Sequence, residues 1–336
     1  MVAFALGGGL LSCTAPNPAY HLQGLPDAGE EEAADAGGTT MRLRDAGVDT
    51  GASSTTGPCG SAQPPLAELV AVDSLAIDKL GNIYFSNDDG TRAWIGKLTP
   101  HALTANKQWL PIPTGLPTRG MAIDDANGLI YFTAGMAPAE LQVTSLATAA
   151  TPTTVYKGFS DPNDVVMGPD GNVYVSDQGD GQIYSVDPAT KKRTKVTTMP
   201  IGIASSGSGP AGLTFAPDHT LVVGYKGGGQ LIRLSLTGGI EARRATFGPI
   251  NDWVNGLAYD QRGRLYLSLF DLDGLRDVVR LDNDDAPPVQ VGKDGHFSTI
   301  AFGRGELRCT DLYVADPGAG MVVRRFPSDS AGLSSP

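Results

Sequence analysis

The chain has 336 residues, of which 41% are hydrophobic and 18% charged, and its formal net charge is −11 at pH 7. This acidic balance argues against nucleic acid and an anionic membrane surface as partners, because both need a basic footprint. No apolar run reaches the length of about 20 residues that a membrane-spanning helix needs. The 44 glycines and 24 prolines favour short strands joined by many turns.

Residues 1–13 read MVAFALGGGLLSC, a short apolar segment that ends in a cysteine. It resembles the end of a bacterial lipoprotein signal peptide, in which a cysteine that follows small or apolar residues is acylated. The resemblance implies that Cys13 carries lipid and that the protein is exported and anchored in the bacterial cell envelope. Basic residues normally begin such a segment and are missing here, so a hydrophobic N-terminus with an incidental cysteine is the alternative.

Residues 14–66 are rich in Ala, Gly, Ser, Thr, Pro, Asp and Glu. Such a segment has too little apolar surface to offset the entropy of ordering it. We therefore predict a disordered tether between the lipid anchor and the rest of the chain.

A repeated pattern occupies residues 67–327, which we predict to be one domain. Each copy has an apolar run, a turn with Pro, Asp, Asn or Gly, and a second run that contains Tyr or Val. The positions two residues before each apolar run recur every 43–48 residues; they are Asp73, Arg119, Asn163, Ala211, Asn255 and Ser298. A period of about 40–50 residues built of short strands is typical of a propeller blade. The six copies predict an all-β, six-bladed β-propeller.

The last copy lacks a candidate for its fourth strand, and residues 328–336 are predicted to be a disordered tail. The apolar run Glu68–Val72 precedes the first copy, and we expect it to pair with the last blade and close the ring. This closure places Cys59 and Cys309 at the same end of the ring, where an oxidising compartment would favour a disulfide. Two separate thiols are the alternative, since spacing alone does not establish connectivity.

The six repeated positions are expected to point toward the top of an axial channel. An acid, two amides, an arginine and a hydroxyl suit a polar small molecule, and oxygen donors suit Ca²⁺ or Mg²⁺. We expect Asp73, Asn163 and Asn255 to bind one divalent cation, with Asp73 and Asn255 catalytic. The residues expected to contact substrate are Asn163, Arg119, Ser298 and His296. The alternative is that Asn, Asp and Ser only begin strands, that His296 is a surface residue and that Trp253 packs between blades.

Several segments resemble the senescence marker protein 30/gluconolactonase family: Asn163–Val166, Ala211–Asp218, Asn255–Asp260 and Ile300–Gly303. The similarity spans residues 67–326, although these motifs overlap those of other six-bladed propellers. The resemblance implies hydrolysis of sugar lactones or related esters with one divalent cation, which we expect to be Ca²⁺ in this chain. It places the metal-binding Glu of the family at Asp73, its substrate Asn at Asn163, its metal Asn at Ala211 and its metal Asp at Asn255.

The metal-binding Asn of the family is therefore replaced by Ala211, and the other two metal ligands are altered at Asp73 and Asn255. These changes should weaken the binding of the cation. Oxygen donors at Asn87, Asp88, Asp177 or Asp271 could compensate. The sequence thus predicts a metal-dependent hydrolase of lactones or esters. The alternative is a non-catalytic envelope propeller that binds a small molecule or a protein at its top face. We expect a monomer that touches the membrane only through its lipid.

Overall fold

The computed structural model describes residues 59–64, 66, 73–88, 92–112, 118–135, 137–197, 209–226, 229–236, 239–244, 253–270, 277–293, 295–317 and 322–333. Its secondary structure elements are strands, numbered β1 to β23. A search of these residues for a helix long and apolar enough to cross a membrane finds none.

The strands form six antiparallel sheets in chain order, called blades 1 to 6. Blades 1 and 2 contain β1 (Leu75–Ile77), β2 (Ile83–Asp88), β3 (Ala93–Leu98), β4 (Asn106–Ile112), β5 (Met121–Asp124), β6 (Leu129–Ala134), β7 (Ala139–Ser145) and β8 (Thr153–Phe159). Blades 3 and 4 contain β9 (Pro162–Met167), β10 (Val173–Asp177), β11 (Gln182–Val186), β12 (Arg193–Thr197), β13 (Pro210–Phe215), β14 (Leu221–Tyr225), β15 (Leu231–Leu234) and β16 (Ile240–Arg244). Blades 5 and 6 contain β17 (Trp253–Tyr259), β18 (Leu265–Phe270), β19 (Val278–Leu281), β20 (Val289–Gly292), β21 (Ile300–Phe302), β22 (Asp311–Asp316) and β23 (Val322–Pro327).

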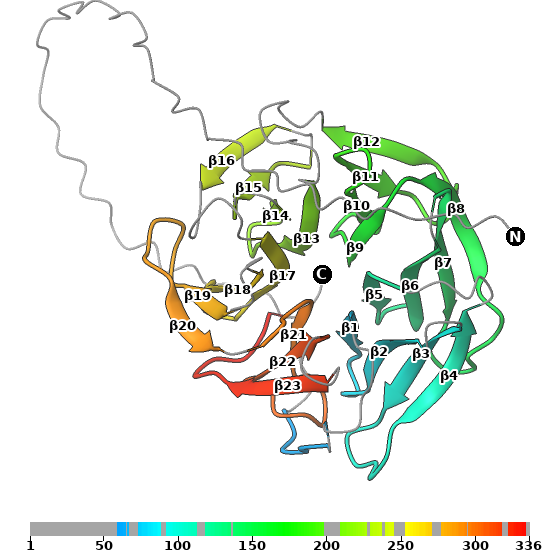
Figure 1. Cartoon of the computed structure of the whole chain (residues 1–336), viewed down its shortest axis with the longest axis horizontal. Helices are drawn as coiled ribbons and strands as arrows, with labels where there is room; N and C mark the ends of the chain where they lie inside the picture. Colours follow the sequence, from blue (N-terminus) through cyan, green and yellow to red (C-terminus); the bar gives the residue numbers. More distant parts are fainter. Residues whose placement is uncertain are drawn as a thin grey trace, which may run out of the picture. The chain divides into compact units, whose positions relative to one another are not determined.

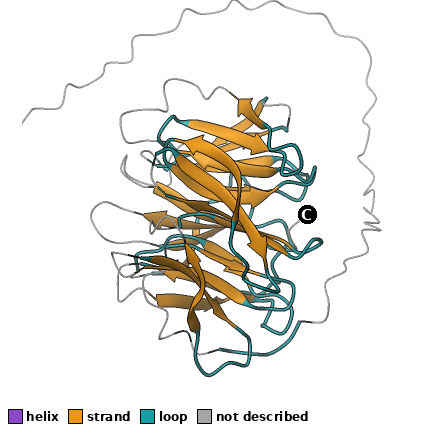
Figure 2. Cartoon of the chain, turned by 90° about the vertical axis from the view of Figure 1, so that its right-hand side faces the viewer, coloured by secondary structure: helices purple, strands orange, loops and turns teal. Residues whose placement is uncertain are grey.

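The six blades surround a common axis, and the first strand of each blade is innermost (Figure 1). The innermost strands pack against one another in chain order, and β21 packs against β1, so the ring is closed. In the side view, loops connect the strands at both ends of the blades (Figure 2). The predicted all-β, six-bladed propeller is thereby confirmed.

An aspartate fixes the turn between the first and second strands of several blades. In blade 1, Asp78 Oδ1 accepts a hydrogen bond from the Asn82 backbone N–H at 2.9 Å. Its Oδ2 accepts from Asn82 Nδ2 at 2.7 Å and from the Tyr84 hydroxyl at 3.1 Å. Asp170 and Asp260 make turns of the same kind in blades 3 and 5. The repeated Asp and Tyr of the sequence pattern are therefore explained by turn structure.

The hydrophobic core lies between neighbouring blades. The face of blade 1 that carries Tyr84 and Ile95 packs on the face of blade 2 that carries Met121 and Phe132, and all four side chains are buried. Each blade covers its faces only against its neighbours, so the complete ring is needed to bury all of them.

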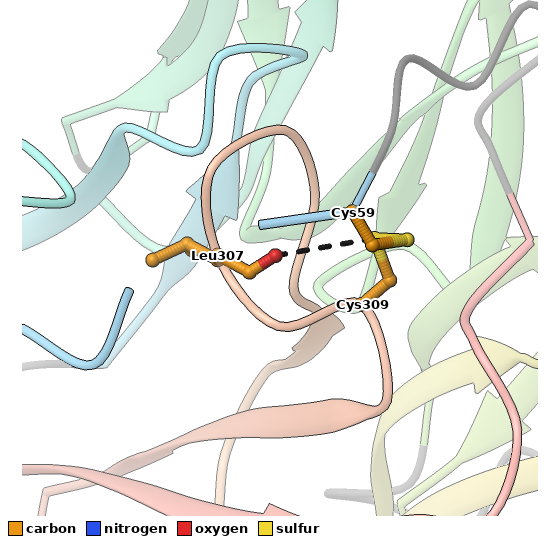
Figure 3. The surroundings of a disulfide bond; sticks show 3 residues. All are labelled: Cys59, Leu307 and Cys309. Carbon is orange, nitrogen blue, oxygen red and sulfur yellow. Dashed lines mark hydrogen bonds between the residues drawn. A yellow bond between two sulfur atoms is a disulfide. The ribbon is translucent and has the colours of Figure 1, made fainter. Parts of the chain in front are cut away.

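A disulfide between Cys59 and Cys309 fastens the start of the described chain to blade 6 (Figure 3). The Cα atoms of the two cysteines are 5.5 Å apart. Next to the disulfide, Ala62 pairs with Leu307 in a parallel bridge. Both contacts fall on the turn between β21 and β22, at the end of the ring opposite the starts of the innermost strands. The predicted pairing of Cys59 with Cys309 is confirmed.

Blade 6 has three strands among the described residues. The closing strand predicted at Glu68–Val72 lies outside those residues, and so does Cys13.

The C-terminal segment differs from the predicted disordered tail, because residues 328–333 lie against blade 5. Leu333 donates its N–H to the Tyr259 carbonyl at 2.8 Å, and Gly332 pairs with Asp260 in an antiparallel bridge.

Candidate functional site

One end of the ring carries the starts of the six innermost strands. Each second strand is antiparallel to the first, so its last residues lie beside the start of the first strand of the same blade. In blade 1, the N–H groups of Asp73 and Ser74 donate to Ser86 Oγ at 3.0 and 2.9 Å. In blade 3, the Asp164 N–H donates to Ser176 Oγ at 2.9 Å. We call these strand starts and the adjacent strand ends the inner rim.

Serines of the inner rim also connect neighbouring blades, a role that the sequence reasoning missed. Ser176 of blade 3 donates its hydroxyl to the Ala211 carbonyl of blade 4 at 2.6 Å. Ser268 of blade 5 donates in the same way to the Ser298 carbonyl of blade 6. The signal in the sequence is a Ser or Thr two residues after the tyrosine of a second strand, at positions 86, 133, 176 and 268. These hydroxyls fix the backbone that carries the candidate site residues.

Glycine allows the first strands to approach one another closely at the inner rim. A Cβ at Gly212 would lie 2.1 Å from the Asn255 carbonyl oxygen, and one at Gly256 would lie 2.4 Å from the Ser298 carbonyl oxygen. A larger side chain at either position would push the neighbouring blade away. The two glycines therefore bring candidate residues of adjacent blades together.

Three predicted site residues form one hydrogen-bonded set, which we call the Asp73 group. The Ser298 hydroxyl donates to Asp73 Oδ1 at 3.1 Å and accepts from Asn255 Nδ2 at 3.1 Å. The residues come from blades 1, 5 and 6; Ser298 is buried, and the other two are partly exposed. Because the Asn255 nitrogen donates to Ser298, its carbonyl oxygen is the atom that could accept a bond from a ligand.

A second set surrounds Lys226, which follows β14 in blade 4 and which the sequence reasoning missed. Lys226 Nζ donates to Gln178 Oε1 at 2.7 Å and lies 5.0 Å from the centre of the Trp253 ring. Gln178 Oε1 also lies 3.5 Å from Asn163 Nδ2, which donates to it. The structure thus joins Asn163 to Gln178 and Lys226, and it places Trp253 against an ammonium group.

Arg119, predicted to contact substrate, forms an ion pair with Asp161 at the start of blade 3. Asp177 holds the backbone of Asp161, because Asp177 Oδ1 accepts a hydrogen bond from the Asp161 N–H at 2.7 Å. Burial raises the pKa of the Asp177 carboxyl, and the N–H groups of Asp161 and Ser160 oppose that rise. The side chains of Arg119 and Asp161 both stay partly exposed, so a ligand at the inner rim could reach them.

His296, predicted to contact substrate, lies two residues before Ser298 and is partly buried. Its backbone N–H donates to Asp316 Oδ1 at 2.8 Å. Asp316 is the last residue of β22, so this bond anchors the His296 backbone at the inner rim of blade 6.

Two of the residues that could replace the missing metal ligands, Asn87 and Asp177, are described by the structure and form hydrogen bonds with the backbone. Asn87 Nδ2 donates to the Lys107 carbonyl at 3.0 Å, and Asp177 holds the backbone before β9. The side chain of Asp88 and the whole of Asp271 lie outside the described residues.

The charged groups of the inner rim act on one another. Burial lowers the pKa of the Lys226 ammonium, and the like charge of Arg119 lowers it further. Asp73 and Asp161 act in the opposite direction. Two cations and two carboxylates, from four different blades, therefore share one electrostatic environment.

The divalent cation that the family resemblance implies does not fit this donor set. Ca²⁺ takes about 6–8 oxygen ligands and binds more tightly as carboxylates are added. Asp73 is the one carboxylate among the implied ligands, while Ala211 is completely buried and has no side-chain donor. Lys226 adds a positive charge nearby. In the described part of the chain, no three His, Cys, Asp or Glu side chains are grouped so that they could bind a metal ion.

No family model matches the chain. The PE-PGRS family protein PE_PGRS18 of Mycobacterium tuberculosis is 34% identical over 65 residues, which cover 19% of this chain and 13% of that protein. The match thus spans a small part of either protein.

Comparison by structure finds six-bladed propellers. A candidate gluconolactonase aligns with a TM-score of 0.60 at 17% identity and covers 82% of this chain and 94% of its own. A gluconolactonase of Xanthomonas campestris aligns with a TM-score of 0.59 at 17% identity, and the alignment covers 78% of this chain and 87% of that protein. The calcium-binding protein regucalcin of Agrobacterium tumefaciens aligns with a TM-score of 0.56 at 17% identity, and the alignment covers 83% of this chain and 98% of that protein. At these identities the similarity shows the fold alone, and at that level it supports the resemblance stated from the sequence.

Proposed function

We propose that the chain is a hydrolase of sugar lactones or related esters that acts at the inner rim. The observation that carries the proposal is the Asp73 group, in which a carboxylate, a hydroxyl and an amide from three blades are joined by hydrogen bonds. The ammonium of Lys226 lies in the same electrostatic environment. The structural similarity to two gluconolactonases supports this reaction class.

The residues of the inner rim suit the hydrolysis of a cyclic ester. The Asp73 carboxylate, oriented by the Ser298 hydroxyl, accepts a proton from a water molecule as that water attacks the carbonyl carbon. N–H donors of Lys226 and Asn163 stabilise the negative charge that develops on the carbonyl oxygen. The ring carbon–oxygen bond then breaks, and the released oxygen takes the proton from Asp73, which gives a hydroxy acid.

The calcium ion expected at Asp73, Asn163 and Asn255 is not needed for these steps. One carboxylate and a nearby ammonium give a reason to expect weak affinity, in the millimolar range of Ca²⁺ sites or weaker. Activity should therefore persist in a chelator.

The second candidate is a non-catalytic propeller that binds a small molecule or a protein at the same rim. Ala211 favours this candidate, because the position that the family resemblance assigns to a metal-binding Asn has no side-chain oxygen. Fold similarity alone does not separate the two functions.

A direct test is hydrolysis of a panel of γ-lactones, δ-lactones and nitrophenyl esters by the purified chain, followed with a pH indicator. Each substrate is measured against its spontaneous rate, once with EDTA and once with Ca²⁺. The proposal predicts enzymatic hydrolysis of at least one lactone in EDTA. Rates equal to the spontaneous ones under both conditions would leave the non-catalytic propeller.

We further propose that the protein works outside the cytoplasm as a monomer, attached to the envelope through Cys13. The Cys59–Cys309 disulfide supports export, because disulfides persist in oxidising compartments. The acidic net charge of −11 supports a membrane contact that is limited to the lipid.

A further inference from the structure

Lys226 is a cation held at the inner rim by neutral groups. Its Nζ donates to the amide oxygen of Gln178 at 2.7 Å and faces the Trp253 ring at 5.0 Å. Among the described residues no carboxylate forms an ion pair with it, although 13 other ion pairs occur. A partly buried ammonium is usually paired with an anion, because removing a charge from water is costly.

The backbone of Lys226 is held in place, and so is the backbone of Gln178, the residue that accepts the hydrogen bond from the Lys226 ammonium. The Lys226 backbone N–H donates to the Gly209 carbonyl at 3.0 Å, which ties the end of β14 to the start of β13. Gln178 packs directly on Gly209, since a Cβ there would lie 2.8 Å from the Gln178 carbonyl oxygen. The acceptor and the donor are thus built on adjoining backbone of blades 3 and 4.

The other charges of the inner rim are already engaged. Arg119 is paired with Asp161, and the Asp73 carboxylate accepts from Ser298. An ammonium has three N–H donors, and Gln178 uses one of them. Of these two cations, Lys226 is therefore the one that a bound anion could pair with without breaking an ion pair.

We propose that Lys226 binds the carboxylate of a small hydroxy acid and supplies, in place of a divalent cation, the positive charge that this ligand needs. A charge-assisted hydrogen bond from an ammonium to a carboxylate is among the stronger ones that a side chain makes. The amide of Asn163, bonded to the same Gln178, and the Asn255 carbonyl oxygen suit the hydroxyl groups of such a ligand. Opening a lactone creates a carboxylate, yet this inference does not rest on hydrolysis, because the acid would bind whether the chain produces it or only senses it.

The test is calorimetric titration of the full chain in EDTA with D-gluconate, using D-glucitol, which has the same hydroxyl-rich chain without the carboxylate, as the neutral probe. Four proteins are compared: the parent, Lys226→Met, Lys226→Arg and the control Lys195→Met, in which an exposed lysine of β12 loses its charge. Thermal melting of each protein shows that it is folded.

The parent should bind gluconate at least about tenfold more tightly than glucitol. Lys226→Met should lose this preference, whereas Lys226→Arg should retain most of it and Lys195→Met all of it. A folded Lys226→Met protein with unchanged gluconate affinity would overturn the inference, as would gluconate binding by the parent that requires added Ca²⁺. Gluconate binding without lactone hydrolysis would uphold this inference and contradict the proposed function. Lactone hydrolysis without gluconate binding that depends on Lys226 would uphold the proposed function and contradict this inference.

Discussion

Ser298 donates its hydroxyl to Asp73 Oδ1 at 3.1 Å although the two residues are 225 positions apart in the chain. The bond lies where the ring closes, because the neighbouring Thr299 Oγ1 accepts the Leu75 N–H at 2.9 Å. The last blade must therefore meet the first before the Asp73 group can form. Closure of the propeller and assembly of the candidate site are the same structural event.

Replacing Ser298 by Ala should separate function from stability. The variant loses one hydroxyl that orients Asp73 and Asn255, so we expect hydrolysis or ligand binding to fall at least about tenfold. Stability should fall by about 1 kcal/mol, the usual net value of a hydrogen bond. Activity and urea denaturation measure the two effects. Thr190→Ala is the control, because its hydroxyl bonds the Asp187 carboxylate at 2.7 Å in an exposed turn; equal activity losses in both variants would contradict the role of Ser298.

The carboxyl of Asp164 should make stability depend on pH. This buried side chain accepts the N–H groups of Val165 and Leu213, each at 2.8 Å, and so links blades 3 and 4. Burial raises its pKa to about 7, against the opposing effect of these two bonds. The folded protein therefore holds the proton more strongly than the unfolded chain. The stabilisation is complete below about pH 4 and is lost as pH rises through 7.

Asp164→Asn isolates this effect. The amide nitrogen cannot accept a hydrogen bond, so the variant should be less stable by about 1–3 kcal/mol at low pH. Between pH 4 and 7 the unfolding free energy of the parent should fall by about 1 kcal/mol per pH unit relative to the variant. Urea denaturation at four pH values measures both slopes. Parallel profiles would show that Asp164 does not titrate in this range.

Loss of the Cys59–Cys309 disulfide should lower stability. The bond closes a loop with a sequence separation of 250, and such cross-links typically contribute about 2–5 kcal/mol. The double variant Cys59→Ser, Cys309→Ser should therefore melt at lower temperature than the parent, and reductant should lower the melting temperature of the parent alone. A parent protein with free thiols at both positions, found by non-reducing peptide mapping, would contradict the bond.

Acylation at Cys13 stays a prediction, because this residue lies outside the described part of the chain. If the lipid is the anchor, Cys13→Ser should move the protein from the membrane fraction to the soluble fraction, while its melting temperature stays unchanged. A variant that still fractionates with membranes would remove the lipid anchor.

The blades could be predicted from the sequence because strand and turn signals are local and repeat. The apolar runs expected two residues after Asp73, Arg119 and Ser298 are the starts of β1, β5 and β21. The link between Lys226 and Gln178 could not be predicted, because it depends on packing between two blades and neither residue belongs to the repeated pattern. The segment 328–333 reads as disordered by composition, yet backbone bonds and the ion pair of Asp329 with Arg264 hold it to blade 5.

The proposed function can be tested most directly with Asp73→Asn, which keeps the size and the hydrogen-bonding oxygen of the side chain but removes its negative charge. The comparison is the initial rate of lactone hydrolysis by this variant and by the parent in the same EDTA-containing buffer, after melting curves have shown that both are folded. If Asp73 accepts the proton of the attacking water, the parent should exceed the spontaneous rate and the variant should fall at least about 100-fold toward it. A variant that hydrolyses the lactone as fast as the parent would contradict a catalytic inner rim.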